Sequence, residues 1–180
     1  EFIAFLINQN INFQFGHTLA DSKICEKYMS SNDISFTHLY NAMSDNNHRN
    51  PGVLSAALNN SKFAEIICDL NHVSEEAILI AKKCIPDLYA ITDSIAASGM
   101  KDGGYSFANV EIEKKNNKVY LNGTNTLAGS VVNMHDTFLN LLKMKISIQD
   151  AVRMTSYSAS KFLKKEDIGV IDNEKKANFL

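Results

Sequence analysis

The sequence predicts an α/β fold in which short buried strands alternate with amphipathic helices. Four apolar or β-branched runs carry this prediction, over residues 11–15, 34–36, 64–69 and 88–92. The alternation implies a parallel sheet with right-handed crossovers, which brings the carboxyl ends of all strands to one edge. Each run is followed by a side chain of a type used in catalysis, namely His17, His38, His72 and Asp93. We therefore expect these side chains to converge.

Helices are predicted between the strands from apolar spacing and capping residues. Residues 1–10 carry apolar side chains at helical spacing, and Asp21 can cap a helix that continues to about residue 31. Residues 53–58 form a further helical segment. Ser74 marks the next helix start because Glu75 and Glu76 follow in the first turn. The predicted apolar face of that helix consists of Ala77, Ile78, Ile80 and Ala81.

The last third of the chain changes character. Residues 105–110 and 118–121, separated by an Asn-Asn turn, predict a β-hairpin on the surface. Residues 131–144 predict an amphipathic helix. Another helix starts at Ser147, where Asp150 completes an approximate capping box, and continues toward residue 163. Residues 177–180 are expected to begin a small β-domain.

Four strand–helix units make half of an eight-stranded barrel, which normally takes about 250 residues. We therefore expect residues 1–165 to be strands 5–8 of a TIM-type (β/α)8 barrel, with the hairpin inserted near residues 104–122. Residues 166–180 would return toward the truncated accessory β-domain. The first residue is Glu1, so the preceding strands are expected to be missing, and a targeting peptide is neither seen nor excluded.

Composition limits the class of protein. A hydrophobic fraction of 45% in 180 residues supports a globular core, and the net charge of −2 without a long basic stripe argues against nucleic acid as a partner. No apolar run reaches the 18 or so residues of a membrane span. Cys25, Cys68 and Cys84 are widely spaced, which suggests reduced core thiols in a reducing compartment, the cytoplasm.

The strand-end residues suggest a divalent metal site. Imidazoles of His17 and His38, an oxygen ligand and a water would form a normal catalytic donor set. Asp93 fits a base that takes the proton of a metal-bound water, whose pKa falls from about 15.7 toward 7. The alternative is that two strand-end histidines and one aspartate occur together by chance.

Two further side chains have both a structural and a functional interpretation. His72 is either an exposed loop histidine or a neutral donor aimed at a substrate carbonyl. Arg49 is either a solvated charge or, near the backbone amides of Asn41 and Ala42, a phosphate ligand. His48 and His135 have no comparable placement and are expected at the surface or on a helix.

Seven short segments together resemble one family. They are Gly16-His17-Thr18, Thr37-His38-Leu39-Tyr40-Asn41-Ala42-Met43, Arg49-Asn50-Pro51-Gly52, Asp69-Leu70-Asn71-His72-Val73, Ile91-Thr92-Asp93, Thr126-Leu127-Ala128-Gly129-Ser130 and Lys176-Ala177-Asn178. In this order they are similar to the N-acetylglucosamine-6-phosphate deacetylases of the amidohydrolase superfamily. The His-Leu-Tyr-Asn-Ala-Met string is highly specific, whereas the Gly-His and Thr-Asp pairs recur in other amidohydrolases.

The resemblance implies a metal-dependent hydrolase with a TIM-type barrel and a small accessory β-domain. Its reaction would convert N-acetylglucosamine 6-phosphate to glucosamine 6-phosphate and acetate. The implied metal ligands are His17 and His38, with zinc expected before iron or manganese, and the implied acid/base is Asp93. His72 would contact the acetamide or the sugar hydroxyls. The implied phosphate-binding segment comprises Asn41, Ala42 and Arg49, and Leu127 would line the acetyl pocket.

The chain also departs from the family pattern. The family's remaining metal ligand is a glutamate from an earlier strand, which this chain lacks, and Asn50 replaces a frequent glutamate. The full-length protein is expected to be a homodimer, because the family commonly is. The sequence leaves two alternatives: another amidohydrolase that acts on a cyclic amide, and a catalytically inactive, truncated scaffold.

Overall fold

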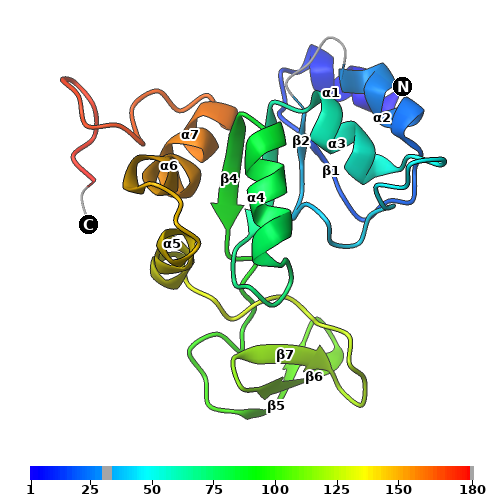
Figure 1. Cartoon of the computed structure of the whole chain (residues 1–180), viewed down its shortest axis with the longest axis vertical. Coiled ribbons are helices and arrows are strands. Elements are labelled where there is room, and N and C mark those ends of the chain that lie inside the picture. The colour runs from blue at the N-terminus through cyan, green and yellow to red at the C-terminus, as the bar shows by residue number, and fades with distance from the viewer. Residues whose placement is uncertain (30–33, 179–180) are drawn as a thin grey trace.

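The computed structural model describes residues 1–29 and 34–178 and confirms the predicted α/β class (Figure 1). Its helices are α1 (Phe2–Asn8), α2 (Ser22–Met29), α3 (Val53–Asn60), α4 (Glu75–Cys84), α5 (Met134–Lys143), α6 (Ile148–Val152) and α7 (Ser158–Phe162). Its strands are β1 (Gln14–Phe15), β2 (Ser35–Phe36), β3 (Phe63–Ile67), β4 (Asp87–Ile91), β5 (Gly103–Phe107), β6 (Val110–Lys115) and β7 (Lys118–Leu121). A π-helical turn, η1 (Arg153–Tyr157), joins α6 to α7.

The first four strands form two parallel pairs. β1 pairs with β2, with Phe15 opposite Phe36, and β3 pairs with β4 over five residues as far as Ile67 and Ile91. The two pairs meet where the N–H of Leu39, just beyond β2, donates to the carbonyl of Glu65 in β3 at 2.8 Å. The predicted parallel alternation is thus present in the described residues.

Side chains from all four strands join in one polar network. Gln14 Nε2 of β1 donates to Glu65 Oε1 of β3 at 2.9 Å and lies 2.7 Å from the Tyr89 hydroxyl of β4. The Ser35 hydroxyl of β2 lies 3.1 Å from the same Tyr89 oxygen. Burial raises the pKa of Tyr89, so its hydroxyl keeps the proton it needs to donate to Glu65. One face of the four strands therefore shares a continuous hydrogen-bonded layer.

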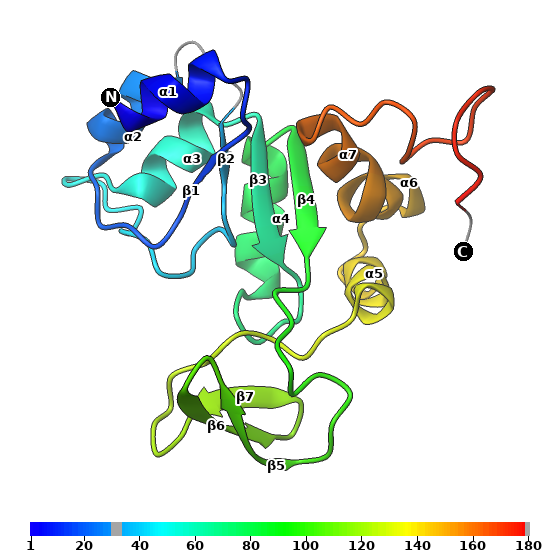
Figure 2. The same ribbon diagram turned by 180° about the vertical axis from the view of Figure 1, so that it is seen from behind.

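Helices α2 to α6 cover the other face, whereas Phe162 of α7 stacks on Tyr89 at the edge of the polar layer. Figure 1 shows α4 across β3 and β4, and Figure 2, from behind, shows the same two strands without a helix in front of them. Fully buried apolar side chains make one large cluster that includes Phe36, Ile66, Ile78 and Leu141. Burying each such side chain contributes about 1.5–3 kcal/mol, so this layer supplies the main cohesion of the parallel part.

Helix starts follow their predicted caps. Asp21 Oδ1 accepts the N–H of Ile24, and the Ser74 and Ser147 hydroxyls accept N–H groups of the first turns of α4 and α6. The predicted helix over 147–163 is present, with the π-helical turn in its middle. The predicted end of the helix near residue 31 lies outside the described residues.

One predicted apolar face is wrong in detail, and one predicted helix has no buried face. Ile80 is 51% exposed, because it lies two residues from the buried Ile78 and hence about 200° around α4. Phe2 and Phe5 of α1 are 71% and 55% exposed, so the apolar spacing that predicts this helix does not mark a face buried within the described chain.

The segment after β4 forms a three-stranded antiparallel sheet, β5–β6–β7, rather than the predicted two-stranded hairpin. Ala108 and Asn109 both have positive φ and turn the chain within the stretch expected to be one strand. Ile112 and Val119 pack against Ala97 beneath this sheet. In Figure 2 the arrowheads of β3 and β4 point toward it, so it lies beyond the carboxyl ends of these parallel strands.

The cysteines, the tail and the surface complete the fold. Cys25 and Cys68 are buried free thiols, but Cys84 is exposed, so the prediction of three core thiols is wrong for Cys84.

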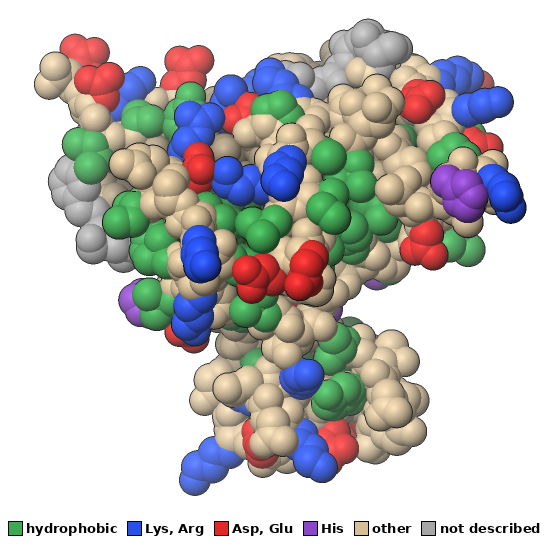
Figure 3. Space-filling view, viewed as in Figure 1, with side chains coloured by type: hydrophobic (Ala, Val, Ile, Leu, Met, Phe, Trp, Pro, Cys, Tyr) green, Lys and Arg blue, Asp and Glu red, His purple; other side chains and the backbone are tan. Residues whose placement is uncertain are grey.

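Residues 163–178 contain no helix or strand, and 179–180, part of the expected β-domain start, lie outside the described residues. No helix in the described part is both long and apolar enough to cross a membrane. Figure 3 shows acidic and basic side chains interspersed over the face that carries α4.

Candidate active site at the strand ends

Three predicted site residues share one backbone geometry. His17, His38 and Asp93 each lie two residues beyond the last residue of their strand, with φ of 46°, 30° and 48°. This left-handed conformation costs a non-glycine residue roughly 1–2 kcal/mol. Such strain persists where the surrounding structure enforces it, and it clusters at functional sites. The chain therefore leaves these three strands through the same kind of turn, which aims each side chain in a similar way.

His17 and His38 face each other. Their Nε2 atoms lie 2.8 Å apart, His17 is exposed and His38 is 6% exposed. Two imidazole nitrogens bound to one zinc ion at about 2.0–2.1 Å lie roughly 2.8–3.0 Å apart at a 90° angle and about 3.3–3.4 Å apart at the tetrahedral angle. The observed 2.8 Å is a hydrogen-bond distance between the two rings and lies at the short end of this range, so the pair is compatible with two positions of a metal donor set.

The rest of such a donor set is not assembled by the described residues. Within residues 1–29 and 34–178 no group of three or more His, Cys, Asp or Glu side chains could hold a metal ion. His38 Nδ1 is buried and has no hydrogen-bond partner there, although a ligating imidazole usually donates this second N–H. The histidine pair accounts for two ligands only.

The turn after His38 is built by Asn41. Its side-chain Nδ2 donates to the carbonyls of His38 and Leu39, both at 3.2 Å, and its backbone N–H donates to His38 at 3.0 Å. Ala42 follows, exposed and with φ of 49°. Asn41 and Ala42 are therefore part of the same turn as the histidine pair.

Arg49 lies further along the same loop, which joins β2 to α3. Its backbone N–H donates to Asn47 Oδ1 at 2.9 Å, and its side chain is exposed. No contact joins it to Asn41 or Ala42 among the described residues. The structure thus does not bring the three predicted phosphate ligands into contact.

His72 is held by an aspartate for which the sequence suggested no role. Its Nδ1 lies 2.8 Å from Asp69 Oδ2, and the two side chains are 8% and 7% exposed. Burial acts to raise the pKa of Asp69, but hydrogen bonds from the His72 ring and from the backbone of His72 and Asn71 outweigh it, so the pKa lies below its usual value. His72 is therefore not a solvent-exposed loop histidine, which was the structural interpretation of the sequence. The Asp-x-x-His spacing directly after a strand is the signal that points to this pair.

Asp93 is anchored through its backbone by the returning end of the insertion. Ser130 donates its N–H to the Asp93 carbonyl at 2.9 Å and accepts from Ile95 N–H at 3.1 Å, while its hydroxyl donates to the Thr92 carbonyl. The Asp93 side chain is exposed. Ser130 was part of a sequence motif but had no predicted role.

Leu127 lies three residues before this anchor. It is half-buried and forms an isolated antiparallel bridge with Tyr120 of β7. The structure therefore brings His17 to His38 and pairs His72 with Asp69. It describes no side-chain contact that links these two pairs to each other or to Asp93.

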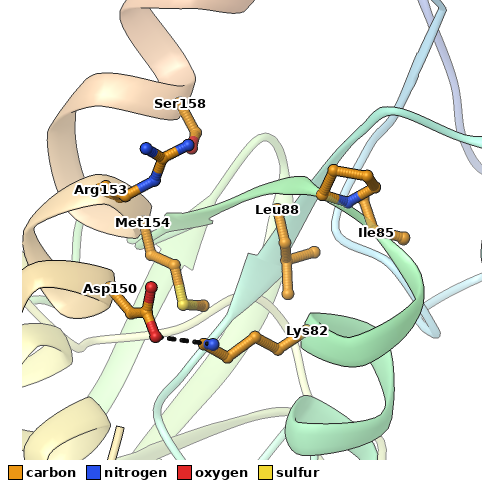
Figure 4. A pocket seen from close by; sticks show the side chains of 8 residues that line it. Lys82, Ile85, Leu88, Asp150, Arg153, Met154 and Ser158 are labelled. Atoms are coloured by element: carbon orange, nitrogen blue, oxygen red, sulfur yellow. Dashed lines mark ion pairs between the residues drawn. The ribbon is translucent and has the colours of Figure 1, made fainter. Parts of the chain in front are cut away.

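A small cavity lies between α4 and the segment from α6 to α7. It is lined by Lys82, Ile85, Pro86, Leu88, Asp150, Arg153, Met154 and Ser158. Figure 4 shows the ion pair between Lys82 and Asp150 at its edge, which measures 2.8 Å. None of the predicted site residues lines it, so it is separate from the strand-end site.

Comparisons with known proteins agree with the resemblance in the sequence. No family model matches the chain. N-acetylglucosamine-6-phosphate deacetylase of Bacillus subtilis is 34% identical over 178 residues, which are 97% of this chain and 43% of that enzyme. The crystal structure of the Pasteurella multocida enzyme superposes with a TM-score of 0.92 at 28% identity, over 98% of this chain and 48% of that one.

A second solved structure is of a complex with a bound ligand. A mutant of N-acetyl-D-glucosamine-6-phosphate deacetylase from Mycobacterium smegmatis, in complex with N-acetyl-D-glucosamine-6-phosphate, has a TM-score of 0.83 at 27% identity. It matches 90% of this chain and 45% of its own length. These three relatives are N-acetylglucosamine-6-phosphate deacetylases, and a further relative, from Escherichia coli O157:H7, is an N-acetylgalactosamine-6-phosphate deacetylase that is 27% identical over 164 residues. The chain spans less than half the length of each.

Proposed function

We propose that this chain is the C-terminal half of a cytoplasmic N-acetylglucosamine-6-phosphate deacetylase. The observation that supports this most is the His17–His38 pair at 2.8 Å, placed at strand ends in a chain whose relatives are these deacetylases. Residues 1–165 would form strands 5–8 of the (β/α)8 barrel, and residues 166–180 would lead into the accessory β-domain. The polar layer across four parallel strands supports a barrel, in which inward side chains meet in layers.

The donor set supports a divalent metal, with zinc first and iron or manganese as alternatives. His17 and His38 would hold it together with a carboxylate from outside this chain. When bound, such an ion polarises a carbonyl and lowers the pKa of its water toward 7.

Asp93 would act as the general base and then as the general acid. Its carboxylate would take a proton from the attacking water and return it to the nitrogen of the departing glucosamine. The exposed side chain of Asp93 leaves room for a substrate, and the Ser130 bond to its carbonyl fixes the backbone that carries it. His72 would stabilise the carbonyl oxygen as negative charge develops on it.

Binding of the phosphorylated amino sugar would involve two other segments. Asn41, Ala42 and the exposed guanidinium of Arg49 would receive the phosphate. Leu127 would contact the acetyl group. We include a homodimer of the full-length protein in this proposal because the resemblance implies it.

Asp93→Asn in the metal-loaded, full-length enzyme tests the reaction. It should keep fold and metal but lose most turnover, roughly 10²-fold or more, because the amide cannot accept the water proton. Asp172→Asn, at an exposed carboxylate of the tail, is the matched control and should retain the wild-type kcat. A near-normal kcat for Asp93→Asn would reject the assigned role.

Arg49→Met tests the substrate class. KM for N-acetylglucosamine 6-phosphate should rise at least about 10-fold, with little change for N-acetylglucosamine, because only the former carries the phosphate. Lys83→Met, which removes an exposed cation of α4, is the control for net charge. Equal effects of Arg49→Met on both substrates would favour an amidohydrolase without a phosphate site, such as a cyclic amide hydrolase.

A further inference from the structure

Asp69 is a nearly buried carboxylate whose two oxygens have different partners. Oδ1 accepts the backbone N–H groups of Asn71 and His72, both at 2.9 Å. Oδ2 lies 2.8 Å from Nδ1 of the His72 ring. The preceding segment is also fixed, because the Cys68 carbonyl accepts from Asn140 of α5 at 3.1 Å. The position of Oδ2 is therefore determined by the backbone and not by the ring it contacts.

These contacts determine where the imidazole proton lies. An ionised carboxylate can only accept hydrogen bonds, so the short contact requires the proton to be on Nδ1. The lowered pKa of Asp69 agrees with an ionised partner at neutral pH. A neutral His72 then has a lone pair, and no proton, on Nε2.

Nε2 is the atom left for a ligand. It makes no hydrogen bond within the described residues and is not among the buried atoms that lack a partner there. A donor contact from Nε2 to a carbonyl oxygen requires a second proton on the ring, and Asp69 balances the resulting charge. The neutral donor predicted from the sequence is thus incompatible with this pairing.

We propose that Asp69 is a positioning residue that orients the His72 ring and holds its proton on Nδ1, so that His72 meets the substrate carbonyl as a charged donor through Nε2. The role given to His72 rests on the proposed deacetylase function. A charged donor forms hydrogen bonds roughly twice as strong as a neutral one, which suits an oxygen that gains negative charge.

Asp69→Asn separates this role from a structural one. The amide oxygen can replace Oδ1 and keep both backbone bonds, which leaves the amide nitrogen in the place of Oδ2. That NH2 donates to Nδ1, moves the ring proton to Nε2 and disfavours a doubly protonated ring. The variant should therefore fold while it presents the wrong form of His72, as the Asp-to-Asn change does in the serine-protease triad.

The first measurement is 15N NMR of the imidazoles in the zinc-loaded, full-length protein. The His72 signal is assigned by its loss in His72→Gln. In the wild type Nδ1 should carry the proton, and in Asp69→Asn the proton should move to Nε2. An unchanged ring proton in the variant would overturn the proposal.

The second measurement is a double-mutant cycle on deacetylation by the same full-length enzyme. Asp69→Asn should lower kcat roughly 10²-fold and change KM less than about 3-fold. In a His72→Gln background the same substitution should change kcat less than about 3-fold, because its effect passes through the ring. Equal losses in both backgrounds would mean a merely structural role and would overturn the proposal.

The two failures can be told apart. If the wild-type full-length enzyme does not hydrolyse N-acetylglucosamine 6-phosphate, the proposed function fails, and the catalytic part of this inference fails with it. The NMR comparison still decides whether Asp69 fixes the ring proton of His72.

Discussion

Gly129 sits where the insertion returns to Asp93, and an added methyl group there meets the site directly. Gly129 has φ of +68°, and a Cβ on it would lie 2.6 Å from Ile95 Cγ2 and 3.3 Å from the Asp93 carbonyl oxygen. Ile95 cannot easily move away, because it is β-branched and its own Cβ would be 3.7 Å from the new atom. Gly129→Ala should therefore destabilise the protein for two reasons.

The expected loss of stability in Gly129→Ala follows from a comparison with two other glycines. Gly99 and Gly123 both have φ of +73° and open space where a methyl group would be added, so alanine there adds only the backbone strain, about 1–2 kcal/mol. At Gly129 the same strain is joined by overpacking against Ile95, which typically costs about 1–3 kcal/mol. We expect Gly129→Ala to lower the free energy of unfolding by about 2–5 kcal/mol.

Urea denaturation followed by circular dichroism measures all three variants. The excess loss in Gly129→Ala over the two controls isolates the contact, and Ile95→Ala in the same chain should recover part of that excess. If Gly129→Ala costs no more than Gly99→Ala, the close packing of Gly129 against Ile95 and Asp93 is refuted.

Three other substitutions test separate features. His17→Ala should lower bound metal in the full-length enzyme, and unchanged stoichiometry by elemental analysis would argue against ligation. Leu70→Gly should raise the free energy of unfolding by up to about 1 kcal/mol, because Leu70 is 40% exposed and strained at φ of 61°; a loss of stability in urea would contradict this. Asp69 has a lowered pKa when folded, so its stabilisation is present above its unfolded pKa of about 3.9 and is lost as pH falls through the lower folded value. The stability difference between wild type and Asp69→Asn should hence shrink below about pH 4, and a constant difference in acid urea titrations would exclude this linkage.

Local signals predicted the elements well because each has a local cause. Asp21, Ser74 and Ser147 cap helices through atoms only a few residues away. The positions of His17 and His38 also followed from strand ends, since parallel strands place their exits at one edge. Contact between the two rings depends on register, which no single strand encodes.

Other features depend on contacts distant in sequence. Ser130 meets Asp93 across 37 positions, and nothing near Ser130 indicates that partner. Ile80 fits an apolar pattern but points away from the core, because the pattern does not say which side of α4 meets the sheet. Asp69 had a local signal in its spacing to His72, but spacing within a loop does not by itself show that the two side chains face each other.

The anchor at Ser130 has a consequence for how such a protein can diversify. The insertion that contains β5, β6 and β7 begins after Asp93 and ends at Ser130. There the backbone of Ser130 forms hydrogen bonds with the backbone of Asp93 and of Ile95. Its junction is closed by these backbone bonds, while Ile95, Ala128 and Val131 beside it pack against Ile112 and Val119 of the sheet. Evolution or an engineer can therefore vary the outer face of that sheet while the Asp93 backbone stays in register, provided that Ile112 and Val119 are kept.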